Sequence, residues 1–206
     1  GGSAMDTAKG IKALLMTDIA HVRANQLPPE EEVPHLAIPG TAGTGAETTA
    51  VAVLYENGQK LSVDHPALLP DGVLLDGSLL DTLPEYHRKS CAMDALAQGI
   101  ESWGAKKATP GSRIHAERAI RGVLDNLTAY LQGDRKAQDE MLHAAYESGV
   151  AILTTRTTAA HAMSYQITKK LGAAHGHACM LTLPHLWAHL AAQAEYQPVS
   201  YTHLTL

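Results

Sequence analysis

The chain has 206 residues, is 45% hydrophobic and carries a formal net charge of −5, which allows one large or two small globular domains with a buried core. No run of basic residues exceeds two, so the composition excludes a broad basic surface and no nucleic-acid partner is expected. No apolar run reaches the roughly 18 residues of a membrane span, so no membrane partner is expected either. Cys91 and Cys179 form neither a CxxC pair nor a disulfide framework, and the chain has no secretory signal pattern, which together predict a cytoplasmic protein.

The opening stretch GGSAMDTAKGI predicts a glycine turn that leads into a helix over residues 4–16, with Ser3 as its N-cap and Asp6 in its first turn. The apolar positions of this helix are Ile11, Leu14 and Leu15. No strand precedes the glycine turn, so we expect the α/β unit that begins here to be incomplete.

Residues 28–83 carry strand and turn signals. The stretch HLAIP predicts a short strand, followed by a glycine-threonine loop and by the alternating run TAVAVLYENGQKLSVD, in which Asn57-Gly58 indicates a hairpin turn. GVLLD, residues 72–76, predicts a further strand, and the segment ends at Pro84. Residues 1–83 are therefore predicted to form a mixed α/β, Rossmann-like part.

Strand signals stop at Pro84, and helical periodicity continues to the end of the chain. Helices are predicted at about 85–104, 110–132, 136–156, 158–171 and 176–193. Residues 84–197 are predicted to form an all-α domain. Residues 198–206 lack a helical period and are expected to be a frayed or non-native tail.

Two glycine-rich stretches favour binding of a phosphate group. Glycines before a helix let the backbone approach an anion at the positive end of the helix dipole, as GGS does here. The second stretch, IPGTAGTGAETT, follows a strand and interleaves Gly40, Gly43 and Gly45 with threonine hydroxyls, which suits a nucleotide. An ordinary glycine turn and a plain surface loop are the alternative interpretations.

The helical half contains candidate metal ligands. Asp94 and Gln98 lie four residues apart on one predicted helix face, and His161 and His175 add two imidazoles. One carboxylate with two imidazoles suits Fe²⁺ or Zn²⁺, although a core helix that happens to be polar is the alternative. Nine further histidines are expected to lie at the surface or to be hydrogen-bonded in the core, and not to bind a metal: His21, His35, His65, His87, His115, His143, His185, His189 and His203.

Taken in order, these stretches resemble the iron-containing (group III) alcohol dehydrogenase family. The matching segments run from about Gly1 to Ala192 and are GGSAMDTAK, HLAIPGTAGTGAETT, PALLPDGVLLDGSLLDTLP, MDALAQGIESW and HAMSYQITKKLGAAHGHACMLTLPH. The resemblance implies a Rossmann-like dinucleotide domain, a helical domain that carries a divalent metal, and catalysis between them. It also implies that the first strand-helix units of the family precede Gly1.

Position by position, the resemblance implies a cofactor site and a metal site. The implied NAD or NADP ligands are Gly1, Gly2, Ser3, Asp6, Thr41 and Thr44, with Ala46 in place of the usual serine. The implied metal ligands are Asp94, His161 and His175, while Gln98 stands where the family has a fourth ligand, a histidine. Tyr165 stands where many members have a further, non-ligand histidine. Fe²⁺ is the expected ion and Zn²⁺ the alternative. A site with Gln98 is expected to bind either ion less tightly, because a glutamine carbonyl is a poorer donor than imidazole.

The segments TTRTTAAHAMSY and HGHACMLTLP are similar to the phosphonoacetaldehyde reductase branch of the family. This similarity implies an NAD(P)H-linked enzyme that interconverts a small aldehyde and a primary alcohol, reducing phosphonoacetaldehyde to 2-hydroxyethylphosphonate, and a homo-oligomer. Arg156 is the candidate to bind the phosphonate, with Lys169 and Lys170 as weaker candidates that could equally form a solvated helix face. His177 is the candidate proton donor.

Two other functions fit the same sequence. The chain could be an inactive fragment or a degenerate metal-binding domain of the family. It could also be a dehydroquinate synthase-like relative, although that group uses a glutamate ligand, whereas this chain has Gln98 and the GTAGTGAE loop.

Overall fold

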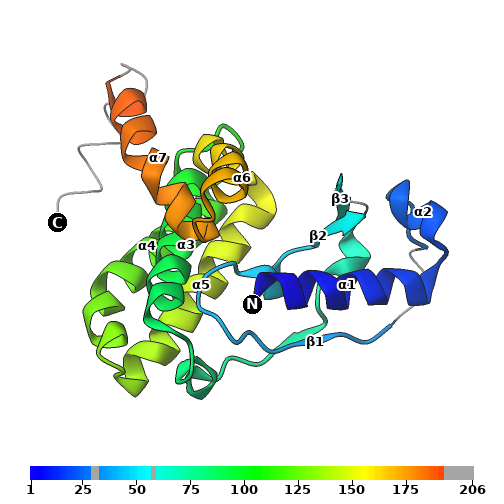
Figure 1. Cartoon of the computed structure of the whole chain (residues 1–206), viewed down its shortest axis with the longest axis horizontal. Coiled ribbons are helices and arrows are strands. Elements are labelled where there is room, and N and C mark those ends of the chain that lie inside the picture. The colour runs from blue at the N-terminus through cyan, green and yellow to red at the C-terminus, as the bar shows by residue number, and fades with distance from the viewer. Residues whose placement is uncertain (29–32, 57–58, 193–206) are drawn as a thin grey trace.

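The computed structural model describes residues 1–28, 33–56 and 59–192. Within these ranges, every strand lies before Pro84 and five long helices follow it (Figure 1). The expected fold class, an incomplete α/β Rossmann-like part followed by an all-helical part, is therefore confirmed.

The N-terminal part combines one long helix with two small pairs of strands. Helix α1 (Gly2–Met16) packs on the antiparallel hairpin of β2 (Val51–Glu56) and β3 (Gln59–Asp64), in which Val51 pairs with Asp64 and Glu56 with Gln59. The predicted Asn57-Gly58 turn lies outside the described residues. Strands β1 (Leu36–Ala37) and β4 (Gly72–Val73) form a parallel pair.

Four details of the N-terminal part differ from the sequence prediction. Helix α1 begins at Gly2 with Gly1 as its N-cap, so Ser3 lies inside the helix and Asp6 lies beyond its first turn. The apolar side chains of Ile11, Leu14 and Leu15 are exposed. Strand β4 is shorter than predicted, because the backbone turns into a short 3₁₀ helix after Asp76. The short helix α2 (Ile19–Arg23), capped by the Asp18 side chain, was not predicted.

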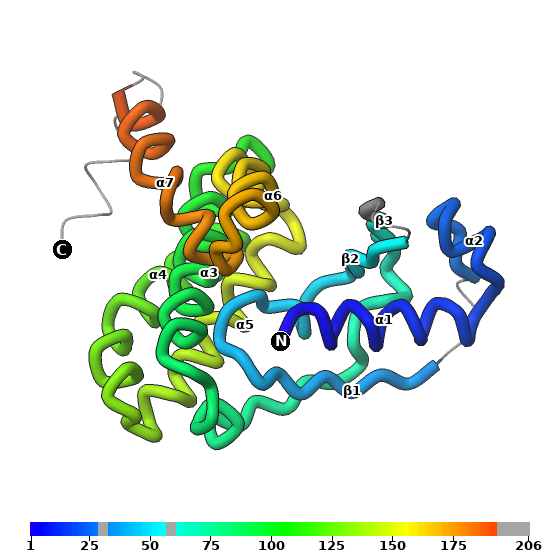
Figure 2. Tube along the Cα trace, viewed as in Figure 1, coloured from blue at the N-terminus to red at the C-terminus, as the bar shows by residue number. Residues whose placement is uncertain are grey.

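The five helices of the second part are α3 (Glu85–Trp103), α4 (Pro110–Leu131), α5 (Arg135–Thr155), α6 (Ala159–Leu171) and α7 (His175–Ala191). The predicted bounds agree with these to within about two residues, because the apolar periodicity of long helices is a strong local signal. Thr109 and Ser112 form a capping box at the start of α4, and Gly172 ends α6 in the left-handed conformation. The Cα trace in Figure 2 follows these helices as one bundle.

Small side chains allow the helices to pack closely. The main core cluster contains Ala92 and Ala95 of α3 and Ala144 and Ala145 of α5, with larger side chains such as Met141 filling the space between the helices. A smaller cluster, which contains Ala97, Ala160, Cys179 and Leu183, joins α3, α6 and α7. Since these three helices meet at this cluster, residues that project beside it are held at fixed positions.

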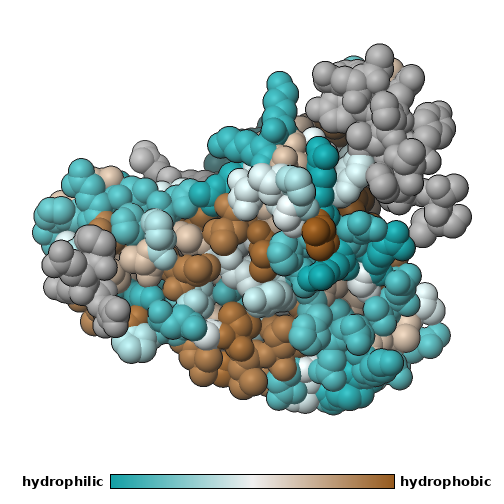
Figure 3. Space-filling model, turned by 180° about the vertical axis from the view of Figure 1, so that it is seen from behind, coloured by the Kyte–Doolittle hydropathy of each residue, from teal (hydrophilic) through white to brown (hydrophobic). Residues whose placement is uncertain are grey.

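Some apolar surface remains exposed. Large exposed apolar side chains of the N-terminal part include Ile11, Leu15 and Leu36. Figure 3 shows apolar surface gathered in the centre and lower part of the face seen from behind. None of the helices in the described ranges is long and apolar enough to cross a membrane.

A buried lysine joins α1 to the segment that precedes β2. The Lys9 side chain is fully buried, and its Nζ donates to the carbonyl oxygens of Ala46 (2.7 Å), Thr49 (2.6 Å) and Val51 (3.0 Å). Burial lowers the pKa of Lys9 to about 8. These bonds hold the middle of α1 against the end of the second glycine loop and the start of β2, so Lys9 has a structural role that its residue type does not suggest.

We expect Lys9→Met to lower the free energy of unfolding by about 3 kcal/mol, because it leaves buried carbonyl groups without a donor at about 1–3 kcal/mol each. Denaturation in urea measures this change. Lys107→Met, at an exposed lysine, is the control and should shift stability by less than about 0.5 kcal/mol. Equal effects of the two substitutions would contradict the tethering role of Lys9.

Candidate metal and dinucleotide site

The two predicted phosphate-binding stretches lie in contact. A Cβ added to Gly1 would lie 3.3 Å from Cγ2 of Thr41, and one added to Gly2 would lie 3.0 Å from Cγ2 of Thr44. The first backbone N–H groups of α1 therefore lie beside the threonines of the second loop, where both can face one anionic group. Ser3 is exposed and Asp6 is partly buried on the same helix.

The second glycine loop also packs against the helical part. Gly45 has a positive φ of 57°, and a Cβ there would lie 2.6 Å from the carbonyl oxygen of Ala145 in α5. From α3, Nε2 of Gln98 donates to the carbonyl oxygen of Thr44 at 3.2 Å. The loop is therefore fixed to α1, α3 and α5 at once, as its path in Figure 1 shows.

Glu47 in this loop is a buried acid with an incomplete set of partners. Its side chain is 2% exposed, and its Oε1 makes no hydrogen bond with any residue in the described ranges. Desolvation raises the pKa of Glu47 above the ordinary value of 4.5, although the charge of Lys9 opposes this effect. The folded protein therefore binds a proton at Glu47 more tightly than the unfolded chain does.

Ionised Glu47 therefore lowers the free energy of unfolding. This loss of stability grows as the pH rises from 4.5, the ordinary pKa, through the higher pKa of Glu47 in the folded protein. We expect Glu47→Gln to be close to wild type in stability near pH 4.5 and more stable than wild type at neutral pH. Thermal melting of both proteins across this range measures the difference. A constant difference in melting temperature at all pH values would contradict this prediction.

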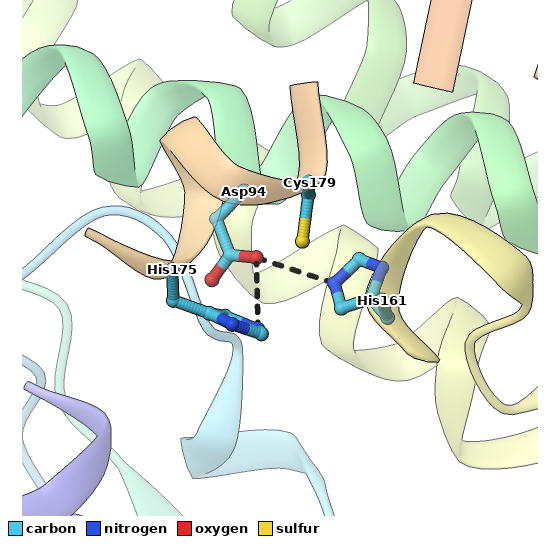
Figure 4. A group of neighbouring side chains, drawn as sticks. All are labelled: Asp94, His161, His175 and Cys179. Carbon is cyan, nitrogen blue, oxygen red and sulfur yellow. Dashed lines mark hydrogen bonds and ion pairs between the residues drawn. The ribbon is translucent and has the colours of Figure 1, made fainter. Parts of the chain in front are cut away.

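Four side chains from three helices meet in the helical part. Asp94 of α3, His161 of α6, and His175 and Cys179 of α7 each place one ligand atom within 4.8 Å of all the others (Figure 4). We call these residues the four-donor group. Gly176 permits this approach, because a Cβ there would lie 1.9 Å from the carbonyl oxygen of Ser90 in α3.

Glu101 fixes the orientation of His161. It accepts hydrogen bonds from Thr158 Oγ1 and from the backbone N–H of Ala160, both at 2.7 Å, and it also bonds Nδ1 of His161. Burial alone would raise the pKa of Glu101, but these bonds, led by the one from His161, lower it below the usual range. An ionised Glu101 can only accept, so Nδ1 of His161 is the donor. Its Nε2 then faces Asp94 Oδ1, 3.3 Å away, and donates to this oxygen when the ring is protonated.

Ser164 fixes the orientation of the His175 ring. Its hydroxyl donates to the carbonyl oxygen of His161 at 2.7 Å, so it accepts from Nδ1 of His175 at 3.1 Å. Nε2 of His175 then also presents a lone pair to Asp94 Oδ1, at 3.7 Å. When each ring is neutral, it therefore has the tautomer that leaves Nε2 available to a metal ion.

The four-donor group strongly favours a positive charge at its centre. Desolvation lowers the pKa of His161, but hydrogen bonds to Asp94, Cys179 and Glu101 outweigh it and raise this pKa to about 12. A proton on His161 relieves the repulsion between lone pairs, and a divalent cation would relieve it more completely.

The distances fit a tetrahedral ion. Neighbouring ligand atoms around a tetrahedral ion with bonds of about 2.1 Å lie about 3.4 Å apart. The two Nε2 to Oδ1 distances, 3.3 Å and 3.7 Å, agree with this separation. A donor set of one carboxylate oxygen, two imidazole nitrogens and one sulfur suits Zn²⁺ or Fe²⁺.

Comparison with known proteins agrees with this geometry. The family described as "Iron-containing alcohol dehydrogenase" matches residues 1–77, and the family described as "Fe-containing alcohol dehydrogenase family, C-terminal" matches residues 89–200. The chain belongs to the iron-containing alcohol dehydrogenase family. The expected cofactors of such an enzyme, a divalent metal and a nicotinamide dinucleotide, are confirmed at the level of this family.

Among similar proteins, phosphonoacetaldehyde reductase from Streptomyces viridochromogenes is 36% identical over 90% of this chain and 50% of its own length. The crystal structure of sulfoacetaldehyde reductase from Bifidobacterium kashiwanohense in complex with NAD⁺ is 32% identical, with a TM-score of 0.87 over 95% of this chain and 54% of that one. An iron-containing alcohol dehydrogenase from Thermococcus thioreducens is 30% identical, with a TM-score of 0.83 over the same share of each chain. The chain thus spans about half the length of the relatives it matches.

Two other residues predicted for the site make hydrogen bonds within the protein. The amide of Gln98 makes contacts within the protein: Oε1 lies 2.8 Å from Ser148 Oγ, whose proton is shared with the carbonyl oxygen of Ala145, and Nε2 donates to the carbonyl oxygen of Thr44. Nδ1 of His177 lies 3.1 Å from the hydroxyl of Tyr86, and His177 does not belong to the four-donor group.

The three candidate phosphonate-binding cations also lie outside the group. The guanidinium of Arg156 pairs with Asp64 of β3 at 2.5 Å, and Lys169 and Lys170 are exposed in the last turn of α6. The structure does bring the ring of Tyr165 next to His175, with centroids 5.9 Å apart.

Sequence reasoning missed two residues of the site. Glu101 lies seven residues after Asp94, on the same face of α3 two turns later, and Cys179 lies four residues after His175 on α7. Both spacings could have drawn attention to these residues. Neither spacing reveals the partner, because His161 is 60 residues from Glu101 in the sequence.

We expect Glu101→Gln to weaken metal binding by about 10–100-fold, because the amide cannot accept all three hydrogen bonds and His161 loses its fixed orientation. Competition with a chromophoric chelator measures Zn²⁺ affinity directly. Glu117→Gln, at an exposed glutamate of α4, is the control and should leave the affinity unchanged. An unchanged affinity in Glu101→Gln would show that Glu101 only caps α6.

Proposed function

We propose that the protein is a metal-dependent, NAD(P)H-linked oxidoreductase that interconverts a small aldehyde and a primary alcohol. One observation carries this proposal: helix α3 joins the metal-competent group to the dinucleotide loop. Asp94 of α3 faces the two imidazoles, and one turn later Gln98 bonds the loop at Thr44. A nicotinamide bound at the loops and a carbonyl bound at the group would therefore lie beside each other.

Each set of residues has a distinct role in this proposal. Gly1, Gly2, Thr41 and Thr44 hold the pyrophosphate, and Asp94, His161 and His175 hold the cation. The bound cation supplies Lewis acidity toward the carbonyl oxygen, and the nicotinamide supplies the hydride. Because the imidazoles are buried or partly buried on helices, they are oriented before the substrate arrives.

His177 is the proposed proton donor. It lies on the first turn of α7 with its ring exposed, and its Nδ1 is bonded to Tyr86. The Tyr86 hydroxyl also accepts from the backbone N–H of Ala174, which fixes it beside the ring. The protonated imidazole of His177 would release the proton on Nε2 to the developing alkoxide, become neutral, and regain a proton from solvent.

For the substrate, we propose phosphonoacetaldehyde, which would be reduced to 2-hydroxyethylphosphonate. Support comes from two similar proteins named for two-carbon aldehydes that carry a tetrahedral oxyanion, a phosphonate in one case and a sulfonate in the other. Arg156 remains the proposed anion ligand and would exchange Asp64 for the substrate. Cytoplasmic location and a homo-oligomeric state also remain predictions.

The test is to follow nicotinamide absorbance with NADH and with NADPH while the purified protein meets phosphonoacetaldehyde, sulfoacetaldehyde, acetaldehyde and propionaldehyde. We expect saturable reduction, with kcat/KM for phosphonoacetaldehyde at least about tenfold above that for acetaldehyde, since a charge-assisted pair contributes about 1.5–3 kcal/mol. If only the neutral aldehydes are reduced, the protein is an aldehyde reductase as proposed, but phosphonoacetaldehyde is rejected as its substrate.

His175→Ala is the matched variant for this assay. It should lose bound metal and lower kcat/KM by more than about 100-fold, because a ligand contributes more than the groups that support it. His143→Ala, at an exposed histidine of α5, should behave as wild type. Retention of both metal and activity in His175→Ala would reject the metal site, and absence of nicotinamide binding in the wild type would favour an inactive protein.

A further inference from the structure

We infer that the thiolate of Cys179 is the fourth protein ligand of the metal, in the role that the family gives to a histidine at the position of Gln98. This inference rests on the proposed function, because it concerns the same cation. It adds a ligand on α7 and changes the donor set from oxygen and nitrogen to oxygen, nitrogen and sulfur.

The first argument is that Gln98 is already engaged. Its Oε1, the only atom that could bind a cation, lies 2.8 Å from the buried hydroxyl of Ser148, whose single proton it shares with the carbonyl oxygen of Ala145, and its Nε2 donates to the carbonyl oxygen of Thr44. To turn toward a metal, the Gln98 side chain would have to leave these contacts with α5 and with the dinucleotide loop. An amide oxygen is also a poorer donor than imidazole for Zn²⁺ or Fe²⁺.

The second argument is the position of Cys179. Its Sγ lies within 4.8 Å of the ligand atoms of Asp94, His161 and His175, and the sulfur points into the space between them in Figure 4. His175 and Cys179 lie four residues apart, so both project from one face of α7. In this chain, the pair of candidate ligands with i, i+4 spacing therefore lies on α7. In the family, such a pair lies on the helix that corresponds to α3.

The third argument is the environment of the sulfur. Cys179 is fully buried in the cluster that joins α3, α6 and α7, next to the hydrogen-bonded ring of His161. A bound divalent ion would replace the thiol proton, which leaves to solvent, and a thiolate is the form that ligates metals. The set of one carboxylate, two imidazoles and one thiolate then cancels the full charge of a divalent ion.

This charge balance has consequences for the metal. A carboxylate with three neutral imidazoles leaves one positive charge on the site, whereas the set with Cys179 leaves none. The neutral site would polarise a carbonyl less strongly, and its sulfur would favour Zn²⁺ over harder ions. We therefore expect the purified protein to retain Zn²⁺ in preference to Fe²⁺.

Cobalt substitution tests the inference without relying on activity. A Co²⁺–thiolate bond gives a near-ultraviolet charge-transfer band that imidazole and carboxylate ligands do not give. We expect this band in the wild-type Co²⁺ protein and in Cys91→Ser, the matched control at the only other cysteine of the chain. We expect no band in Cys179→Ser, and a Zn²⁺ affinity at least about tenfold lower by chelator competition.

The design remains decisive if Cys179→Ser does not fold. Because the chain has two cysteines, a band that persists in Cys91→Ser must come from Cys179. Absence of the band from the wild-type Co²⁺ protein would overturn the inference, as would its survival in a folded Cys179→Ser. Aldehyde reduction without the band would reject Cys179 as a ligand and leave the proposed function intact. The band without aldehyde reduction would support Cys179 as a ligand and reject the proposed function.

Discussion

The repulsion between converging lone pairs is the constraint on which the rest of the helical part depends. Oδ1 of Asp94 lies 3.3 Å and 3.7 Å from the Nε2 atoms of His161 and His175, while the Nδ1 atom of each ring is hydrogen-bonded on the opposite side. Such an arrangement is unfavourable without a positive charge between the atoms. The surrounding helices therefore hold the three side chains around a position that a proton on His161 or a cation can occupy, and their packing shows how they do so.

That packing combines small residues with a few buried polar bonds. Alanines and Gly176 bring α3, α6 and α7 close, and Glu101 and Ser164 then fix the two rings by bonds to the nitrogens that face away from the centre. In the N-terminal part, Lys9 has the corresponding role, since one ammonium group collects three carbonyl oxygens. In both parts, a single buried polar group orders a segment that apolar contacts alone would leave poorly defined.

Local signals in the sequence were sufficient for the five long helices after Pro84 and for the resemblance that pointed to Asp94, His161 and His175. Helical periodicity depends on residues a few positions apart, so one sequence contains it. The burial of Lys9 and the exposure of Ile11 could not be predicted, because tertiary packing overrides residue type there. Similarly, the roles of Glu101 and Cys179 arise from contacts between helices that are distant in sequence.

The bond between Gln98 and the carbonyl oxygen of Thr44 also limits how the two parts can move. Asp94 and Gln98 are one turn apart on α3, so the rise between them is about 6 Å, set by helix geometry. Many two-domain enzymes close a cleft by rotating their parts about a hinge. Here such a rotation could bring other surfaces together, but it could not change the spacing between the dinucleotide loop and the metal ligands without breaking this bond. Any movement of this kind would therefore leave the candidate metal ligands and the dinucleotide loop in register with each other.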